Sequence, residues 1–174
     1  MRTKLVTGIT VTWLCITTVV SVRADDSLTK QRQARLPDTP IEQLQEYALD
    51  SDWRVRREVA TNRRAPADLL DKLASDSNVE VKIAVATNVA TNEKTFMKLA
   101  ADPDKTIRSV VARFEFVPAS VLDKLATDPE PDIRLEVVQS FNVSESTLQR
   151  LTQDEYPQIR ELASQILANR REQQ

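Results

Sequence analysis

The stretch Leu70-Asp-Lys-Leu-Ala-Ser-Asp76 contains the pattern on which most of this 174-residue sequence is built. The pattern Leu-x-x-Leu-Ala-x-Asp returns at residues 96–102, with Phe96 in place of the first leucine, and at 122–128, so each copy begins 26 residues after the one before. Related copies at 44–50 and 148–154 extend the series in both directions. A fixed period of this length is typical of repeat proteins, in which each unit stacks on its neighbours.

A second pattern follows in every copy, as in Val55, Arg56 and Val59. Apolar residues four positions apart share one face of a helix. We therefore expect two short helices in each unit, the second beginning at the aspartate that ends the first pattern, as in Asp102-Pro103. The first helix is expected to open at a proline, which needs no N–H partner there, in the copies with Pro40, Pro66 and Pro118.

The predicted fold is all-α, a solenoid of five two-helix repeats. Helices of about ten residues do not persist alone in water, so their stability must come from stacking. The final helix continues beyond the repeat pattern and is expected to cover the open end of the core. The expected organisation is a signal peptide at 1–24, a polar linker at 25–39, repeats at 40–65, 66–91, 92–117, 118–143 and 144–169, and a polar tail at 170–174.

The first 24 residues resemble a secretory signal peptide. Arg2 and Lys4 precede an apolar run at 5–20, and Ala24 offers a cleavage site. The run is shorter than the roughly 20 residues that cross a bilayer, so we expect cleavage rather than retention as an anchor, and no stable membrane span afterwards. We therefore expect the protein to be exported to the periplasm or to the cell exterior. Loss of three basic residues and no acidic ones would change the net charge from −2 to about −5.

Residues 25–174 contain no histidine, cysteine or glycine, since Gly8 and Cys15 lie in the leader. This composition removes the imidazole base, the thiolate nucleophile and the usual zinc ligands. It also removes Gly-rich phosphate loops and dinucleotide-binding motifs. We therefore expect no catalytic residues, no metal and no cofactor.

The segment 50–62, Asp-Ser-Asp-Trp-Arg-Val-Arg-Arg-Glu-Val-Ala-Thr-Asn, resembles the leucine-rich repeat variant family, and more broadly HEAT-like repeats. The resemblance covers 40–169 and rests on the aspartate, the base six residues later, the branched residue before that base and the proline that opens the first helix. It implies a right-handed superhelix of paired short helices, in some relatives with one helix wound as a 3₁₀ helix, that serves as a binding or scaffolding surface. Asn92 and Ser144 depart from this pattern at the proline position, and Phe114 and Ser140 depart from it where Asn62 and Asn88 stand.

One acidic and one basic residue recur in all five copies. Because they recur in every unit, we interpret them as a structural ladder of carboxylates that pair with bases, not as a metal or anion site. The ladder consists of Asp50, Arg56, Asp76, Lys82, Asp102, Arg108, Asp128, Arg134, Asp154 and Arg160.

Residues unique to one repeat are better candidates for binding. Trp53, Arg54 and Arg57 combine an aromatic with basic residues in the first repeat, and Arg113 and Phe116 interrupt the pattern in the third. Aromatic and arginine side chains dominate many protein interfaces. A nucleic-acid partner is disfavoured by the acidic charge and by export.

The sequence therefore predicts an exported, monomeric, non-enzymatic interaction or scaffold module that holds a protein or peptide on one solenoid face. Two alternatives remain open at this stage. One is an enzyme accessory, or an enzyme that relies on a carboxylate or lysine with a shifted pKa in a groove. The other is a structural spacer of the cell envelope.

Overall fold

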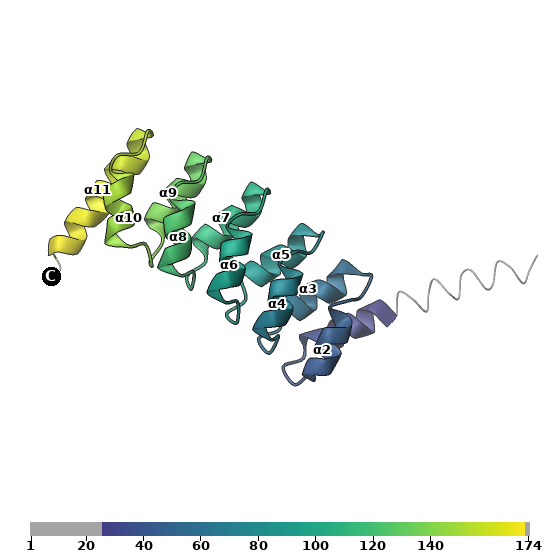
Figure 1. Ribbon diagram of the computed structural model, residues 1–174. Coiled ribbons are helices and arrows are strands. Elements are labelled where there is room, and N and C mark those ends of the chain that lie inside the picture. The colour runs from purple at the N-terminus through teal and green to yellow at the C-terminus, as the bar shows by residue number, and fades with distance from the viewer. Residues whose placement is uncertain (1–25, 173–174) are drawn as a thin grey trace, which may run out of the picture.

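The computed structural model describes residues 26–172, so the predicted signal peptide lies outside the described residues. Five helix pairs follow one another along a single axis (Figure 1). The first helices of the pairs are α2 (Ile41–Tyr47), α4 (Ala67–Leu73), α6 (Glu93–Leu99), α8 (Ala119–Leu125) and α10 (Glu145–Leu151). The second helices are α3 (Trp53–Thr61), α5 (Val79–Ala86), α7 (Lys105–Arg113), α9 (Pro131–Gln139) and α11 (Pro157–Glu172). The all-α solenoid predicted from the 26-residue period is confirmed.

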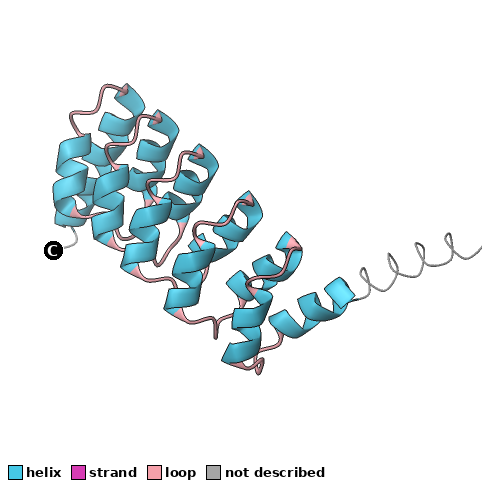
Figure 2. Cartoon of the chain, turned by 45° about the vertical axis from the view of Figure 1, so that its right-hand side comes forward, coloured by secondary structure: helices cyan, strands magenta, loops and turns pink. Residues whose placement is uncertain are grey.

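The pairs stack so that first helices form one layer and second helices form another (Figure 2). Contacts between successive second helices are more extensive than those between successive first helices. One continuous apolar core runs between the layers from Ala34 to Leu167. Each repeat contributes its patterned leucines and branched residues to this core; Leu70 and Val81, for example, are fully buried.

The three opening prolines stand at the N-cap, immediately before the first helical residue, and not inside the helix as expected. Their extended backbone directs the chain into the helix without a side-chain hydrogen bond. In the two units that lack proline, Asn92 and Ser144 cap the helix through their side chains. They accept the N–H groups of Thr95 and Thr147 at 2.9 and 3.1 Å. The first helix can therefore begin either after a proline or after a side-chain cap.

The expectation that the repeated aspartate starts the second helix is wrong by two residues. Asp102 accepts the N–H of Asp104 at 2.9 Å, and Asp104 is the N-cap, accepting the N–H of Thr106 at 2.8 Å. The helix begins at Lys105, so Pro103 belongs to the turn. The repeated aspartate shapes this turn because its other carboxylate oxygen is held by an ion pair.

Residues 26–35, expected to be part of a polar linker, are helical. This segment is the second helix of an incomplete repeat that precedes the first full one. Lys30 lies 26 positions before Arg56 and donates to Asp50 at 3.0 Å, as the ladder bases do. Ala34 is fully buried, and its carbonyl accepts from Asn62 at 2.7 Å. The segment therefore covers the first end of the core.

Repeated asparagine side chains join neighbouring units through buried backbone groups. Asn88 donates to the carbonyl oxygens of Ala60 and Asn62 at 2.7 and 3.0 Å. In the fourth repeat Asn142 makes the same kind of bridge, to Glu115 and Val117, from two positions later than the pattern predicts. A displaced asparagine thus replaces the missing one.

The last helix, α11, closes the other end of the core with Ile159, Ala163 and Leu167. It extends to Glu172, so helix replaces the expected polar tail at residues 170–172. Arg170 donates to the carbonyl of Val143 at 2.9 Å, which ties this last turn to the preceding repeat. Among residues 26–172, no helix is long and apolar enough to cross a membrane.

Candidate functional site

The ladder residues join each repeat to the next. Arg56 donates through Nε and its second terminal nitrogen to both oxygens of Asp76, at 2.6 and 2.9 Å. Its remaining terminal nitrogen reaches the backbone carbonyl of Asp50 at 2.8 Å. The base therefore binds the carboxylate of the following repeat, and it contacts only the backbone of the aspartate six residues earlier. One guanidinium fixes two turns at once.

Equivalent ion pairs recur along the whole array. Their shortest N–O distances are Lys30–Asp50 3.0 Å, Arg56–Asp76 2.6 Å, Lys82–Asp102 2.7 Å, Arg108–Asp128 2.7 Å and Arg134–Asp154 2.7 Å. Arg160 makes the backbone contacts of the series, to Asp154 and Glu155, and no aspartate follows it in the described chain.

Electrostatics favour the charged forms of these groups. The hydrogen bonds from Arg134 hold the pKa of Asp154 below its usual range. Burial alone would raise the pKa of Asp76, but hydrogen bonds from Arg56 and from the Asn78 N–H outweigh it and lower that pKa. Such carboxylates already have their donors, and in the described range no three acidic, histidine or cysteine side chains gather to hold a metal. These ion pairs therefore join each repeat to the next.

The first group of binding candidates, on α3, is engaged within the molecule. The guanidinium carbons of Arg54 and Arg57 lie 5.0 and 5.6 Å from the centre of the Trp53 ring, which also packs against the core. Arg57 donates to Glu58 at 2.7 Å, and Arg35 from the N-terminal segment donates to the same carboxylate at 2.9 Å. The Trp53 ring and Glu58 are engaged by these contacts, whereas the side chain of Arg54 stays 56% exposed, so binding by this group remains a prediction.

The second group lies at the end of α7 and in the turn after it, so α5 separates it from the first. Phe114 is half-buried and contacts Phe96 and Phe116, with ring centres 5.9 and 5.6 Å apart. The ring of Phe116 itself is 58% exposed. In the next repeat the side chain of Phe141 is 90% exposed. Arg113, at the end of α7, is exposed as well, so this region presents aromatic and basic side chains to solvent.

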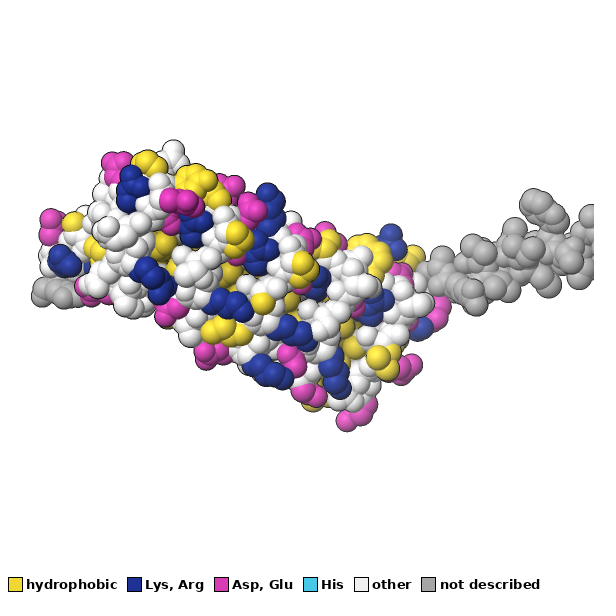
Figure 3. Space-filling model, turned by 45° about the horizontal axis from the view of Figure 1, so that its top comes forward, with side chains coloured by type: hydrophobic (Ala, Val, Ile, Leu, Met, Phe, Trp, Pro, Cys, Tyr) yellow, Lys and Arg dark blue, Asp and Glu magenta, His cyan; other side chains and the backbone are white. Residues whose placement is uncertain are grey.

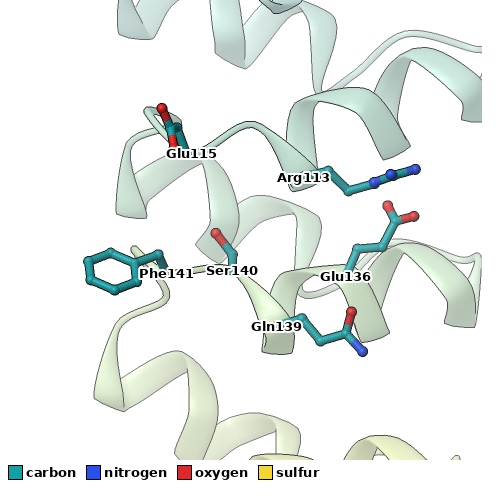
Figure 4. A pocket seen from close by; sticks show the side chains of 6 residues that line it. All are labelled: Arg113, Glu115, Glu136, Gln139, Ser140 and Phe141. Atoms are coloured by element: carbon teal, nitrogen blue, oxygen red, sulfur yellow. The ribbon is translucent and has the colours of Figure 1, made fainter.

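A surface hollow of about 470 Å³ lies next to Phe141 (Figure 4). Arg113 and Glu136 point toward one side of the hollow, and Phe141 lies at its other end. Glu136 accepts from Ser109 at 2.9 Å through Oε1, whereas its buried Oε2 has no hydrogen-bond partner among the described residues. Burial raises the pKa of this carboxyl. The rest of the lining comes from Glu115, Gln139 and Ser140.

Sequence reasoning did not select Glu136. Its signal is visible only when the repeats are aligned, because the equivalent positions in the second and third repeats are Ala84 and Val110. In the first repeat this position holds Glu58, which two arginines bind, so a carboxylate on this half-buried helical stripe without a cation requires a reason.

Comparison with known proteins agrees with this architecture. Residues 53–78 match the family model described as leucine rich repeat variant. The chain is also similar to a solved structure described as a leucine-rich repeat variant with a novel repetitive protein structural motif, with 27% identity and a TM-score of 0.58. The match covers 74% of this chain and 51% of the other, so this chain spans about half of that structure's length. No curated protein matches it.

These two matches agree with the pairs of short helices and with the fixed 26-residue period. The chain carries the repeat and the fold of the leucine-rich repeat variant family.

Proposed function

We propose that the protein is an exported, non-enzymatic interaction module that binds a protein or peptide. The observation that carries the proposal is the exposure of Phe116 and Phe141 in the third and fourth repeats, together with that of Arg113 at the end of α7. Large aromatic side chains are unfavourable in water, and with arginine they are the commonest anchors of protein interfaces. We call Arg113, Phe116 and Phe141 the aromatic surface.

The rest of the array supports a role as a rigid frame. A single core and a continuous ladder hold successive repeats in fixed positions. A surface built on such a frame loses little conformational entropy when it binds. The aromatic surface is therefore preorganised for a partner.

The charge distribution suits a polypeptide better than a polyanion. Lys and Arg side chains recur along the array but are interspersed with Asp and Glu and with hydrophobic side chains (Figure 3). Several of the bases are already bonded within the molecule; Lys98 and Arg150, for example, donate to backbone carbonyls of the preceding repeat at 2.7 and 3.0 Å. A mixed surface of this kind matches the polar rim and apolar centre of protein interfaces.

The test is crosslinked capture from the native host with the mature chain, comparing the wild type with the double variant Phe116→Ser, Phe141→Ser. We expect the variant to lose the partner that the wild type captures and to keep its helical circular-dichroism spectrum. Leu49→Ser is the matched control, because Leu49 is 87% exposed on the first-helix side. Equal capture by all three proteins would refute the proposed surface.

A further inference from the structure

Two glutamates occupy equivalent positions three repeats apart, and their surroundings differ. Glu58 receives Arg57 on one carboxylate oxygen at 2.7 Å and Arg35 on the other at 2.9 Å. At Glu136, three repeat lengths further on, Leu135 replaces the first of these arginines. Two arginines therefore bind the carboxylate of Glu58, whereas the carboxylate of Glu136 does not have two arginines bound to it.

The counterpart of Arg35, the second of these arginines, is present in the sequence but makes no ion pair with Glu136 among the described residues. Arg113 stands three repeat lengths after Arg35, yet within the described range no ion pair joins it to Glu136. Oε1 of Glu136 is satisfied by Ser109 alone, and the buried Oε2 has no donor. A buried acceptor without a donor is costly, so a ligand that supplies the donor recovers that free energy.

We propose that the hollow at Glu136 binds a basic side chain, lysine or arginine, of the polypeptide partner. This inference rests on the proposed function and names the chemistry of the partner. The Glu136 carboxylate turns so that its buried Oε2 faces the hollow, and the ligand's N–H group donates to it, as Arg35 does to Glu58. The equivalent site in the same molecule thus provides the geometry of the complex.

The charges and shape of the hollow fit this ligand. Its lining carries two carboxylates, Glu115 and Glu136, against the single guanidinium of Arg113, which leaves one excess negative charge. Phe141 stands at the other end of the hollow from the Glu136 carboxylate (Figure 4). An apolar residue next to the base in the partner can therefore contact the ring. The volume of about 470 Å³ accommodates one extended side chain and its neighbour.

The test is an NMR titration of the mature chain with N-acetyl-arginine amide and, separately, N-acetyl-norleucine amide, which has an apolar chain without charge. We expect saturable shifts from the arginine compound, confined to amides near Ser109, Arg113 and Glu136. The dissociation constant should be in the millimolar range, about 4 kcal/mol, as is ordinary for a ligand of this size. Equal shifts from the norleucine compound would overturn the inference.

Variants locate the binding group. Glu136→Gln should weaken arginine binding at least tenfold while the remaining amide spectrum is unchanged. Glu58→Gln is the matched control and should leave the affinity as it is. Arg113→Gln should tighten binding severalfold, because it removes the competing cation. Unchanged affinity in Glu136→Gln, or lost affinity in Arg113→Gln, would refute the site.

Failure here is separable from failure of the proposed function. If arginine amide does not bind but the Phe116, Phe141 variant still loses its captured partner, the interaction role stands and the basic ligand is wrong. If arginine amide binds at Glu136 but capture survives in that variant, the aromatic surface is wrong.

Discussion

The ladder makes a quantitative prediction at Arg134, whose side chain is 7% exposed and whose partner Asp154 is 5% exposed. Arg134→Met keeps much of the apolar stem but removes donors at 2.7 and 3.0 Å from that carboxylate. Asp154 then retains only the N–H of Tyr156, at 2.9 Å. Removing one partner of a buried pair leaves an uncompensated charge, so the free energy of unfolding should fall by about 3 kcal/mol at neutral pH.

Arg160→Met is the matched control. Arg160 makes the backbone contacts of the ladder, at 2.7 and 3.0 Å, without a following carboxylate among the described residues. Its loss should cost only about 1 kcal/mol, as for ordinary hydrogen bonds. The difference between the two variants therefore measures mainly the carboxylate pairing of one rung, because the further contact of Arg134 with Glu155, at 3.1 Å, is to a side chain that is 73% exposed and adds little.

The assay is urea denaturation followed by circular dichroism from neutral to acidic pH. Since hydrogen bonds from Arg134 lower the pKa of Asp154 in the folded state, the pair stabilises the fold above the ordinary pKa of 3.8. This contribution is lost as the pH falls through the lowered value. The difference between wild type and Arg134→Met should shrink over that interval. Equal losses in the two methionine variants at neutral pH would refute the assignment of the ladder as a stabilising device.

Four further predictions concern other polar contacts. Glu136→Gln should raise the free energy of unfolding at pH 7 by about 1 kcal/mol. Burial raises the pKa of Glu136, so the wild type is stabilised below the ordinary value of 4.5 and loses that stability as the pH rises and the carboxyl ionises, whereas glutamine stays neutral. Glu58→Gln should lower the free energy of unfolding at pH 7 by about 2 kcal/mol, and this effect should fade in acid because Arg35 and Arg57 outweigh burial and depress the pKa of Glu58. Denaturant melts of both glutamine variants at pH 7 and pH 4 test these opposite changes. A change of the same sign in the two variants at pH 7 would contradict the reasoning. Asn88→Ala, which strands two buried carbonyls, should cost about 2 kcal/mol and the exposed Asn142→Ala less, as thermal unfolding will measure; the reverse order would be inconsistent with burial as the cause. Lys30→Met should increase amide exchange in residues 26–35 while the exchange of α9 stays unchanged, and uniform exchange would contradict a local role in covering the end of the core.

The repeat, the two helices of each unit and the apolar core were predictable because the period is regular over five copies. Helix starts were less predictable. The aspartate at 102 has the residue type of an N-cap, but its two oxygens serve the turn and the ion pair, so Asp104 caps the helix. Spacing along one chain does not reveal a partner in the next repeat, which is why the ladder's pairing across 20 residues was not anticipated.

The N-terminal helix was missed because it is half a unit in which Ala24 stands at the position of the ladder aspartate, and its polar composition resembles a linker. Lys30 and Ala34 were the available signal, as both fit the period one repeat before Arg56 and Ala60. Among the candidate binding residues, composition could not distinguish Trp53, which contacts its own arginines, from Phe116, which is exposed. That distinction depends on side-chain geometry.

The ladder has a consequence for how the array can be lengthened. Each rung takes its cation from one unit and its anion from the next, so the interacting unit straddles the boundary of the sequence repeat. A cassette of 26 residues can therefore be cut at any point in the period, provided that it returns to the same phase. Duplication of 60–85 or of 73–98 keeps every existing rung and adds one, whereas an insertion out of phase breaks one rung and leaves the others whole. Unequal recombination can therefore lengthen such an array from a breakpoint at any position within the repeat.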